Sequence, residues 1–186
     1  MGEPSMPRHY RYNAFISYRH NPRDQQIAGQ LLKLLEAMHF KDREKLHIFR
    51  DQEEFPTSSD LGNNIHRALE ESEFLILICT PELLESKWCR EELLYFRKLH
   101  NNTNRNILPL LVSGEPGDAF PPELFTDMVE ERLPDGTVWQ EAREVEPLGA
   151  DVRAETIKHS LKRLKETEYL RIAAALLNCR FDDLYR

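Results

Sequence analysis

The sequence predicts an α/β fold in which a central parallel sheet is flanked by helices and followed by a C-terminal helical extension. Short apolar runs alternate with segments whose apolar residues recur at helical spacing. This alternation is typical of right-handed βαβ units around an open parallel sheet. Residues 74–79 are apolar at every position, as expected for a strand in the middle of such a sheet.

The first two strand–helix units occupy the N-terminal third of the chain. Residues 12–18 form a short apolar strand that Asn21-Pro22 ends. Apolar residues then recur at helical spacing over 27–38. A second strand is expected at 46–49, and after a polar loop a helix is expected over 61–69.

The middle of the chain continues the same alternation. The strand at 74–79 is followed by a helix over 88–100 and a fourth strand at 107–112. Proline lacks the N–H that a central strand needs, so Pro109 indicates a position near the sheet edge or an irregularity.

Beyond residue 112 the regular pattern lapses. Eleven acidic residues lie between Glu115 and Asp151, against only two arginines. We expect an acidic, irregular linker at 126–150, with a turn at 134–136 and a short edge strand at Val138-Trp139. Helical periodicity returns over 153–164 and 169–177. The sequence therefore suggests a first domain over 1–125 (core about 10–125) and a helical extension over 151–186.

Composition excludes several classes of protein. The 186 residues are 40% hydrophobic and 31% charged, with a net charge of −7, which argues against a nucleic-acid partner. The three cysteines and seven histidines lack the spacing of metal ligands. Cys79 and Cys89 are expected to be small buried apolar residues, which indicates a reducing compartment. The longest apolar run is too short to span a bilayer. We therefore expect a cytoplasmic protein, and we expect that these 186 residues make no contact with a membrane.

Trp88 and Glu92 form the most informative pair. They are four residues apart at the start of an amphipathic helix, so both side chains rise on one face. An aromatic ring beside a carboxylate suits a flat base and a positively charged ribose, and therefore indicates nucleotide chemistry. The alternative is that Trp88 closes the edge of the core and Glu92 is a solvated surface acid.

Three separated segments are expected to meet at one crevice. Ligands of open parallel sheets bind beyond the carboxyl ends of the strands. Ser17-Tyr18-Arg19, Arg50-Asp51 and the turn before Trp88 all lie at such ends.

Four blocks of sequence together resemble a Toll/interleukin-1 receptor (TIR) domain. They are YNAFISYR at 12–19, FRDQEE at 49–54, ALEES at 68–72 and SKWCREEL at 86–93. The Trp-Cys-x-x-Glu-Leu form is similar to the bacterial and plant branches, in which many members cleave NAD⁺. The resemblance implies a flavodoxin-like fold. The segment after 112 departs from the family pattern and resembles extensions that lead into further modules.

The resemblance also implies roles for individual residues. The family's catalytic glutamate falls on Glu92, and Trp88 would line the nicotinamide or adenine pocket. The rest of the pocket would be shaped by Ser17, Tyr18, Arg19, Phe49 and Asp51. The loop from Gln52 to Asp60 corresponds to the BB loop, through which, with other TIR surfaces, copies self-associate. It has Pro56-Thr57-Ser58-Ser59 where many members have a glycine.

Cleavage of NAD⁺ requires unusually little apparatus. Nicotinamide departs as a neutral pyridine, so one acid suffices to stabilise the oxocarbenium-like charge, and NAD⁺ is a substrate without any added cofactor. No glycine-rich phosphate cradle occurs, so Arg19 and Arg50 are candidates for the phosphates. Arg19 could instead pair with a local acid such as Asp24, and Asp51 could cap a turn.

Two functions remain open at this stage. The first is an NAD⁺ nucleosidase that yields nicotinamide plus ADP-ribose or a cyclic ADP-ribose isomer in bacterial anti-phage or stress defence. The second is a non-enzymatic TIR scaffold that acts by homotypic association.

Overall fold

A five-stranded parallel sheet forms the centre of the molecule. The computed structural model describes residues 9–51 and 59–185, and within them the strand order is β2-β1-β3-β4-β7. The strands are β1 (Tyr12–Ser17), β2 (Ile48–Arg50), β3 (Ser72–Cys79), β4 (Ile107–Leu111) and β7 (Ala150–Asp151). This is the flavodoxin-like order, whose topological switch point lies between β1 and β3. The predicted fold class is confirmed.

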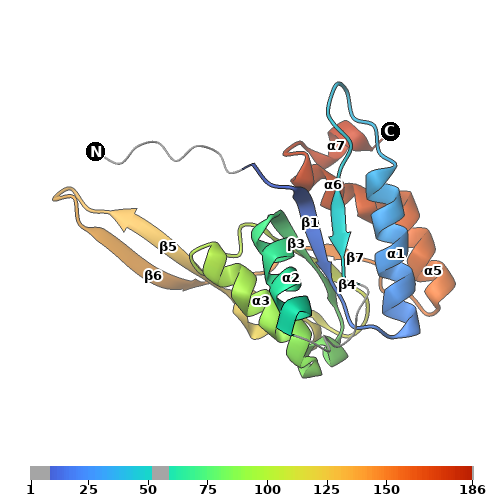
Figure 1. The fold of residues 1–186 in the computed structure, drawn as a ribbon, viewed down its shortest axis with the longest axis horizontal. Helices are drawn as coiled ribbons and strands as arrows, with labels where there is room; N and C mark the ends of the chain where they lie inside the picture. Colours follow the sequence, from blue (N-terminus) through green and yellow to red (C-terminus); the bar gives the residue numbers. More distant parts are fainter. Residues whose placement is uncertain (1–8, 52–58, 186) are drawn as a thin grey trace.

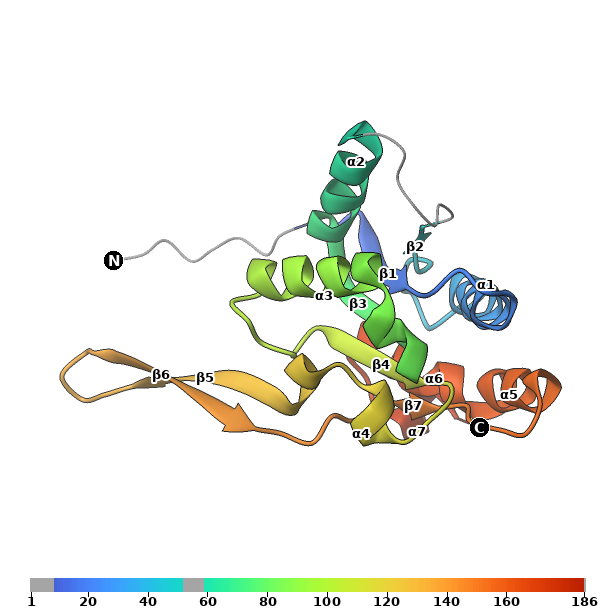
Figure 2. The same cartoon turned by 90° about the horizontal axis from the view of Figure 1, so that it is seen from below.

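Helices cover both faces of the sheet (Figure 1). One face is covered by α1 (Pro22–Glu36), α5 (Ile157–Arg163) and α6 (Tyr169–Leu176), and the other by α2 (Ser59–Glu70) and α3 (Lys87–Leu99) (Figure 2). The shorter elements are η1 (Pro81–Glu85), α4 (Pro116–Ala119), η2 (Pro122–Phe125), the π-helical turn η3 (Leu164–Glu168) and α7 (Phe181–Leu184). Among the described residues no helix is long and apolar enough to cross a membrane.

The two cores follow from the alternation of side chains along the strands. Ile16 and Ile76 point toward α1 and α6, whereas Phe15 and Leu75 point toward α2 and α3. Successive residues of a strand point to opposite faces, so each central strand supplies both cores.

The C-terminal extension is part of the same folded body. Leu110 and Leu111 of β4 pair with Ala150 and Asp151 of β7, which makes β7 the last strand of the sheet. Helix α6 contributes to the core on the α1 face. The predicted boundary at residue 125 therefore does not separate two folded units in the structure.

Residues 126–150 differ from the expected irregular linker. β5 (Thr126–Arg132) and β6 (Val138–Glu144) form an antiparallel ribbon that projects away from the body of the molecule (Figures 1 and 2). Gly136, with φ +86°, completes the predicted turn. All seven residues of β6 are exposed, so the segment lacks the alternation that normally reveals a strand. Val138 and Trp139 begin β6, the second strand of this ribbon, and are not at an edge of the main sheet.

Candidate active site

A pocket of about 210 Å³ lies at the carboxyl ends of β1 and β2, where α3 begins. Its lining brings together five of the predicted site residues with five others: Tyr18, Arg19, Asp51, Trp88 and Glu92, and His20, Glu85, Ser86, Lys87 and Cys89. The predicted convergence of three separated segments is confirmed.

The start of α3 places the aromatic ring and the acid in this pocket. Ser86 is extended, and its Oγ accepts a hydrogen bond from the Cys89 N–H at 3.3 Å, so the helix begins at Lys87. One turn separates Trp88 from Glu92, and both line the pocket. Trp88 is half-buried and belongs to neither core.

Glu92 is a buried acid and not a solvated surface residue. Only 7% of it is exposed, and its Oε2 has no hydrogen-bond partner among the described residues. Burial raises the pKa of Glu92 well above its ordinary value, and the nearby Asp51 carboxylate adds to the shift. The Glu92 carboxyl thus lies at the pocket with one oxygen that no described residue satisfies.

A hydrogen bond ties the ends of β1 and β2 together beside Glu92. The Tyr18 hydroxyl donates to the Asp51 carbonyl oxygen at 2.7 Å. Tyr18 is buried, which raises its pKa and keeps the hydroxyl protonated. The His20 ring stacks on it with 4.5 Å between centroids. The hydrogen bond from the Tyr18 hydroxyl fixes the position of the Asp51 backbone.

Arg19 connects the end of β1 to the segment before α3. Its Nη1 donates to the Glu82 carbonyl oxygen at 2.9 Å and lies 3.7 Å from Glu85 Oε2. Asp24 pairs with Arg23, at 3.1 Å, so the local acid that Arg19 meets is Glu85 and not Asp24.

Three candidates do not line this pocket. Ser17 is buried directly before it, with no partner for its Oγ within the described chain. Phe49 packs on Phe15 and Tyr12, with centroids 5.1 and 5.2 Å apart. Arg50 lines another cavity with α1, so it is not placed beside Arg19 as expected. Most of the predicted BB loop, residues 52–58, lies outside the described residues.

Sequence reasoning missed the polar rim of the pocket. His20, Glu85 and Lys87 adjoin predicted residues in the chain, which is the signal that could have identified them. Cys89 also lines the pocket, but burial and the nearby Glu92 raise its pKa to about 12, so it is a poor nucleophile. No group of three or more metal-ligating side chains occurs among the residues that the structure describes.

Comparison with known families agrees with this geometry. The family model described as TIR domain matches residues 14–146. The chain belongs to the TIR domain family. This TIR chain is 35% identical over 107 residues, 56% of its length, to the NAD(+) hydrolase ApTIR of Actinoplanes sp.. It is 25% identical over 62% of its length to human Toll-like receptor 6.

These similarities concern parts of larger proteins. The TIR chain spans 14% of the length of ApTIR and 14% of Toll-like receptor 6. Among solved structures, the TIR domains of the activated Roq1 resistosome match 57% of this chain and 60% of that one, at a TM-score of 0.45 and 24% identity. A metazoan TIR-STING receptor from C. gigas matches 66% of this chain and 38% of that one, at a TM-score of 0.48 and 24% identity.

Proposed function

We propose that this TIR chain hydrolyses NAD⁺ at the bond between nicotinamide and ribose. The observation that supports it most is the unpartnered, buried Glu92 oxygen beside Trp88 in a pocket at the carboxyl ends of the strands. The 35% identity to a bacterial NAD(+) hydrolase supports the same activity.

In this proposal Glu92 stabilises charge that develops on the ribose. As the glycosidic bond lengthens, nicotinamide leaves as a neutral ring and the ribose becomes oxocarbenium-like. A carboxylate held in a pocket away from water stabilises that charge far better than one in solution. Trp88 supplies a flat face for a planar ring, and no second acid is needed because the leaving group requires no proton.

Substrate binding and the ionisation of Glu92 are linked. Burial raises the pKa of Glu92 in the free protein, whereas the nicotinamide ring of NAD⁺ carries a positive charge. An opposite charge within a few ångströms favours the carboxylate, so binding of NAD⁺ lowers the pKa of Glu92. We therefore expect kcat/KM to rise with pH as Glu92 ionises, because the carboxylate is the active form.

The phosphates of the dinucleotide have cationic groups at the rim. Arg19 and Lys87 both line the pocket. Lys87 is 86% exposed and lies 4.0 Å from Glu91, and can turn toward an anion at little cost. Arg50, which lines a different cavity, is not part of this proposal.

The finer assignments rest on the same proposed reaction. The ADP-ribosyl product is released in linear form or as a cyclic isomer, because water and a second group of the substrate can both attack the same cation. A role in bacterial anti-phage or stress defence, self-association through TIR surfaces that include the loop 52–60, and a cytoplasmic location are proposed from the sequence resemblance and the relative from Actinoplanes sp..

Product analysis tests the proposal. The full chain is incubated with NAD⁺ over a range of protein concentrations, and products are separated by chromatography. We expect nicotinamide and an ADP-ribosyl product, which is ADP-ribose or its cyclic isomer. The amount of nicotinamide should equal the amount of ADP-ribosyl product. The absence of nicotinamide at every protein concentration would favour the non-enzymatic scaffold.

A further inference from the structure

The β5–β6 ribbon presents an open strand edge to solvent. Within the described chain, neither of its strands pairs with a third. Trp139 and Val138 near the tip are 57% and 50% exposed. A two-stranded ribbon is marginally stable in water, and an unpaired edge is a template for another strand. The ribbon therefore has the features of an interaction surface.

Backbone hydrogen bonds define which groups face outward from β6. The Leu133 N–H donates to Thr137 O, and the Val145 N–H donates to Phe125 O, each at 2.9 Å. Odd-numbered residues of the second strand thus direct their backbone groups toward β5. Alternation directs those of the even-numbered residues outward. The even-numbered residues of β6 must therefore form the hydrogen-bonded pairs with any antiparallel strand that is added to this edge. The residues of the added strand that lie opposite them must direct their own backbone groups toward β6.

A second copy of β6 meets this requirement with complementary charges. When two β6 strands pair about Ala142, Glu141 of each copy lies opposite Arg143 of the other. Opposite charges directly across an antiparallel pair are stabilising. The outer edge of β5 is less suitable, because it is more acidic and its Thr126 carbonyl already accepts from Asn104 at 3.0 Å.

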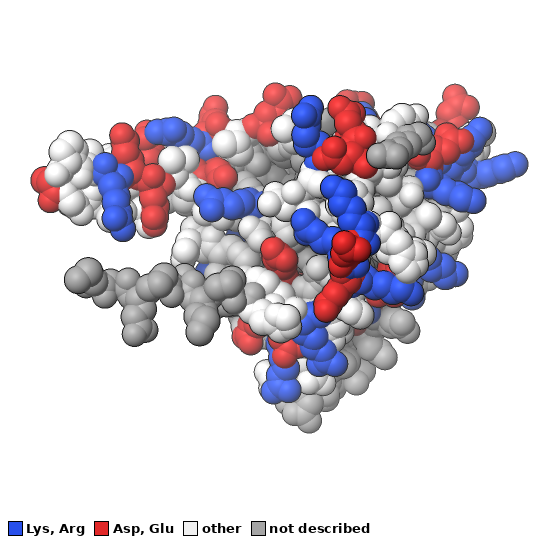
Figure 3. Space-filling model, turned by 90° about the horizontal axis from the view of Figure 1, so that it is seen from above, with Lys and Arg blue, Asp and Glu red and all other residues white. Residues whose placement is uncertain are grey.

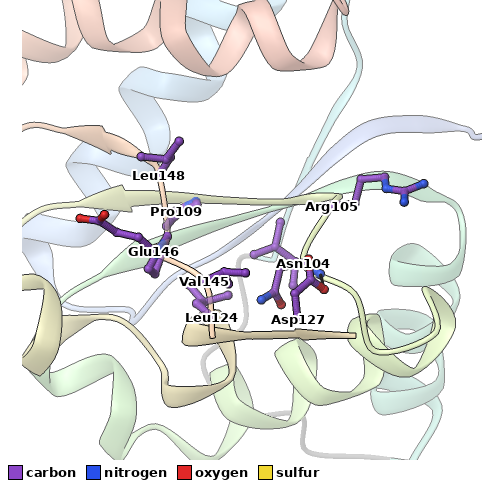
Figure 4. A pocket seen from close by; sticks show the side chains of 10 residues that line it. Asn104, Arg105, Pro109, Leu124, Asp127, Val145, Glu146 and Leu148 are labelled. Carbon is purple, nitrogen blue, oxygen red and sulfur yellow. Dashed lines mark hydrogen bonds between the residues drawn. The ribbon is translucent and has the colours of Figure 1, made fainter. Parts of the chain in front are cut away.

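The same register places Trp139 opposite Val145 of the second copy. Val145 lines a pocket of about 240 Å³ at the root of the ribbon, together with Leu124, Pro109 and Leu148. Figure 4 shows Val145 and Leu124 close together in this pocket, with Leu148 on the neighbouring extended segment. Leu148 is 86% exposed, so the pocket has an apolar rim at which an indole would be covered.

We propose that two copies of this chain associate through the outer edges of their β6 strands, antiparallel about Ala142, to form a four-stranded sheet. Each copy supplies Trp139 to the root pocket of the other. Such an interface is isologous and closed, so it yields a dimer and not a filament. Figure 3 shows the projecting ribbon with both acidic and basic side chains, as charge pairing between copies requires. The interface is separate from the Glu92 pocket and does not depend on the proposed hydrolase activity.

Charge exchange tests the register. In Glu141→Arg every cross-copy pair becomes Arg–Arg, and in Arg143→Glu every pair becomes Glu–Glu. Sedimentation velocity over a range of micromolar concentrations should show a wild-type dimer, with the dimer dissociation constant of each single variant raised about tenfold or more. An equimolar mixture of the two variants restores both opposite-charge pairs and should form a heterodimer. A monomeric wild type, or a mixture no tighter than the single variants, would overturn the proposal.

Proline substitution tests the edge itself. Ala142→Pro removes an outward N–H at the centre of the proposed interface. Met128→Pro removes the outward N–H directly across the ribbon on β5, which donates to Asp127 Oδ1 at 3.0 Å. Both variants perturb the same ribbon, but only Ala142→Pro should abolish the dimer. Persistence of the Ala142→Pro dimer, or equal loss in both variants, would contradict the proposal.

Discussion

At the scale of single residues, Glu92 is buried, and its Oε2 accepts no hydrogen bond from a described residue. Its folded pKa is raised above the unfolded value of 4.5. Between these two values the folded chain binds one more proton than the unfolded chain, so stability falls as pH rises. A neutral glutamine avoids this loss. The predicted site therefore reduces the stability of the fold at neutral and alkaline pH.

Glu92→Gln should raise the free energy of unfolding at pH 8 by about 1 kcal/mol or more, and the difference from wild type should vanish near pH 4. Urea denaturation at both pH values measures it. Glu91→Gln is the control, because Glu91 is exposed beside Lys87 and should show no such pH dependence. A Glu92→Gln variant less stable than wild type at pH 8 would refute the buried-acid interpretation.

Trp88 should affect substrate binding more than folding, because it lines the pocket and joins neither core. Loss of one stacking face costs about 1–3 kcal/mol. We expect Trp88→Ala to raise KM for NAD⁺ about tenfold, with less than about 1 kcal/mol lost in stability. Trp88→Phe should recover much of the affinity. Steady-state kinetics measures KM and calorimetry measures stability. A Trp88→Ala variant with a large loss of stability and an unchanged KM would contradict this prediction.

Much of the pocket could be predicted from the sequence, but its orientation and burial could not. Tyr18, Arg19 and Asp51 follow strand ends, and the rule for parallel sheets brings such residues together. Phe49 and Arg50 lie in the short strand β2, where side-chain direction depends on a register that the sequence does not specify. The burial of Glu92 depends on contacts between separated segments.

At the scale of elements, β7 depends on the close approach of Gly149 to β4. A methyl group on Gly149 would lie 2.3 Å from the Pro109 carbonyl oxygen. In a parallel strand the N–H and C=O of a residue point the same way, so the missing N–H of Pro109 also faces this side. β4 is thus next to the edge strand, and Pro109 precedes its two pairs with β7.

Gly149→Ala should lower the free energy of unfolding by about 1–3 kcal/mol, because the clashing atom belongs to the backbone and cannot rotate away. Gly117→Ala is the matched control, since no atom lies within 4 Å of its added methyl group. Urea denaturation compares them. Equal stability of the two variants would show that β7 tolerates displacement.

The elements that the sequence missed have a common physical cause. Strands β1, β3 and β4 contain runs of buried apolar residues, and helices α1 and α3 bury apolar residues at helical spacing. The sequence displays both patterns. β6 buries none of its residues, and β7 has only two. Neither gives a periodic signal, so their pairing became visible only in three dimensions.

At the scale of the whole molecule, the pocket is small for its proposed substrate. About 210 Å³ lies below the 300–1,000 Å³ typical of ligand sites, so the lining residues could enclose only one end of the proposed dinucleotide substrate. We expect specific activity to rise with protein concentration, as a neighbouring copy that associates through a TIR surface other than β6 covers the rest. A dilution series with light scattering measures this. Constant specific activity from a monomer would contradict it.

Glu92 is the group proposed to stabilise the transition state. The most direct measurement is the rate of nicotinamide release from NAD⁺ by wild type, Glu92→Gln and Glu91→Gln at equal concentration and pH. Removal of one preorganised electrostatic group costs about 10²–10³ in rate, so Glu92→Gln should lose at least that much while Glu91→Gln stays within about twofold of wild type. Full activity in Glu92→Gln, with loss of activity in Glu91→Gln, would contradict the role proposed for Glu92.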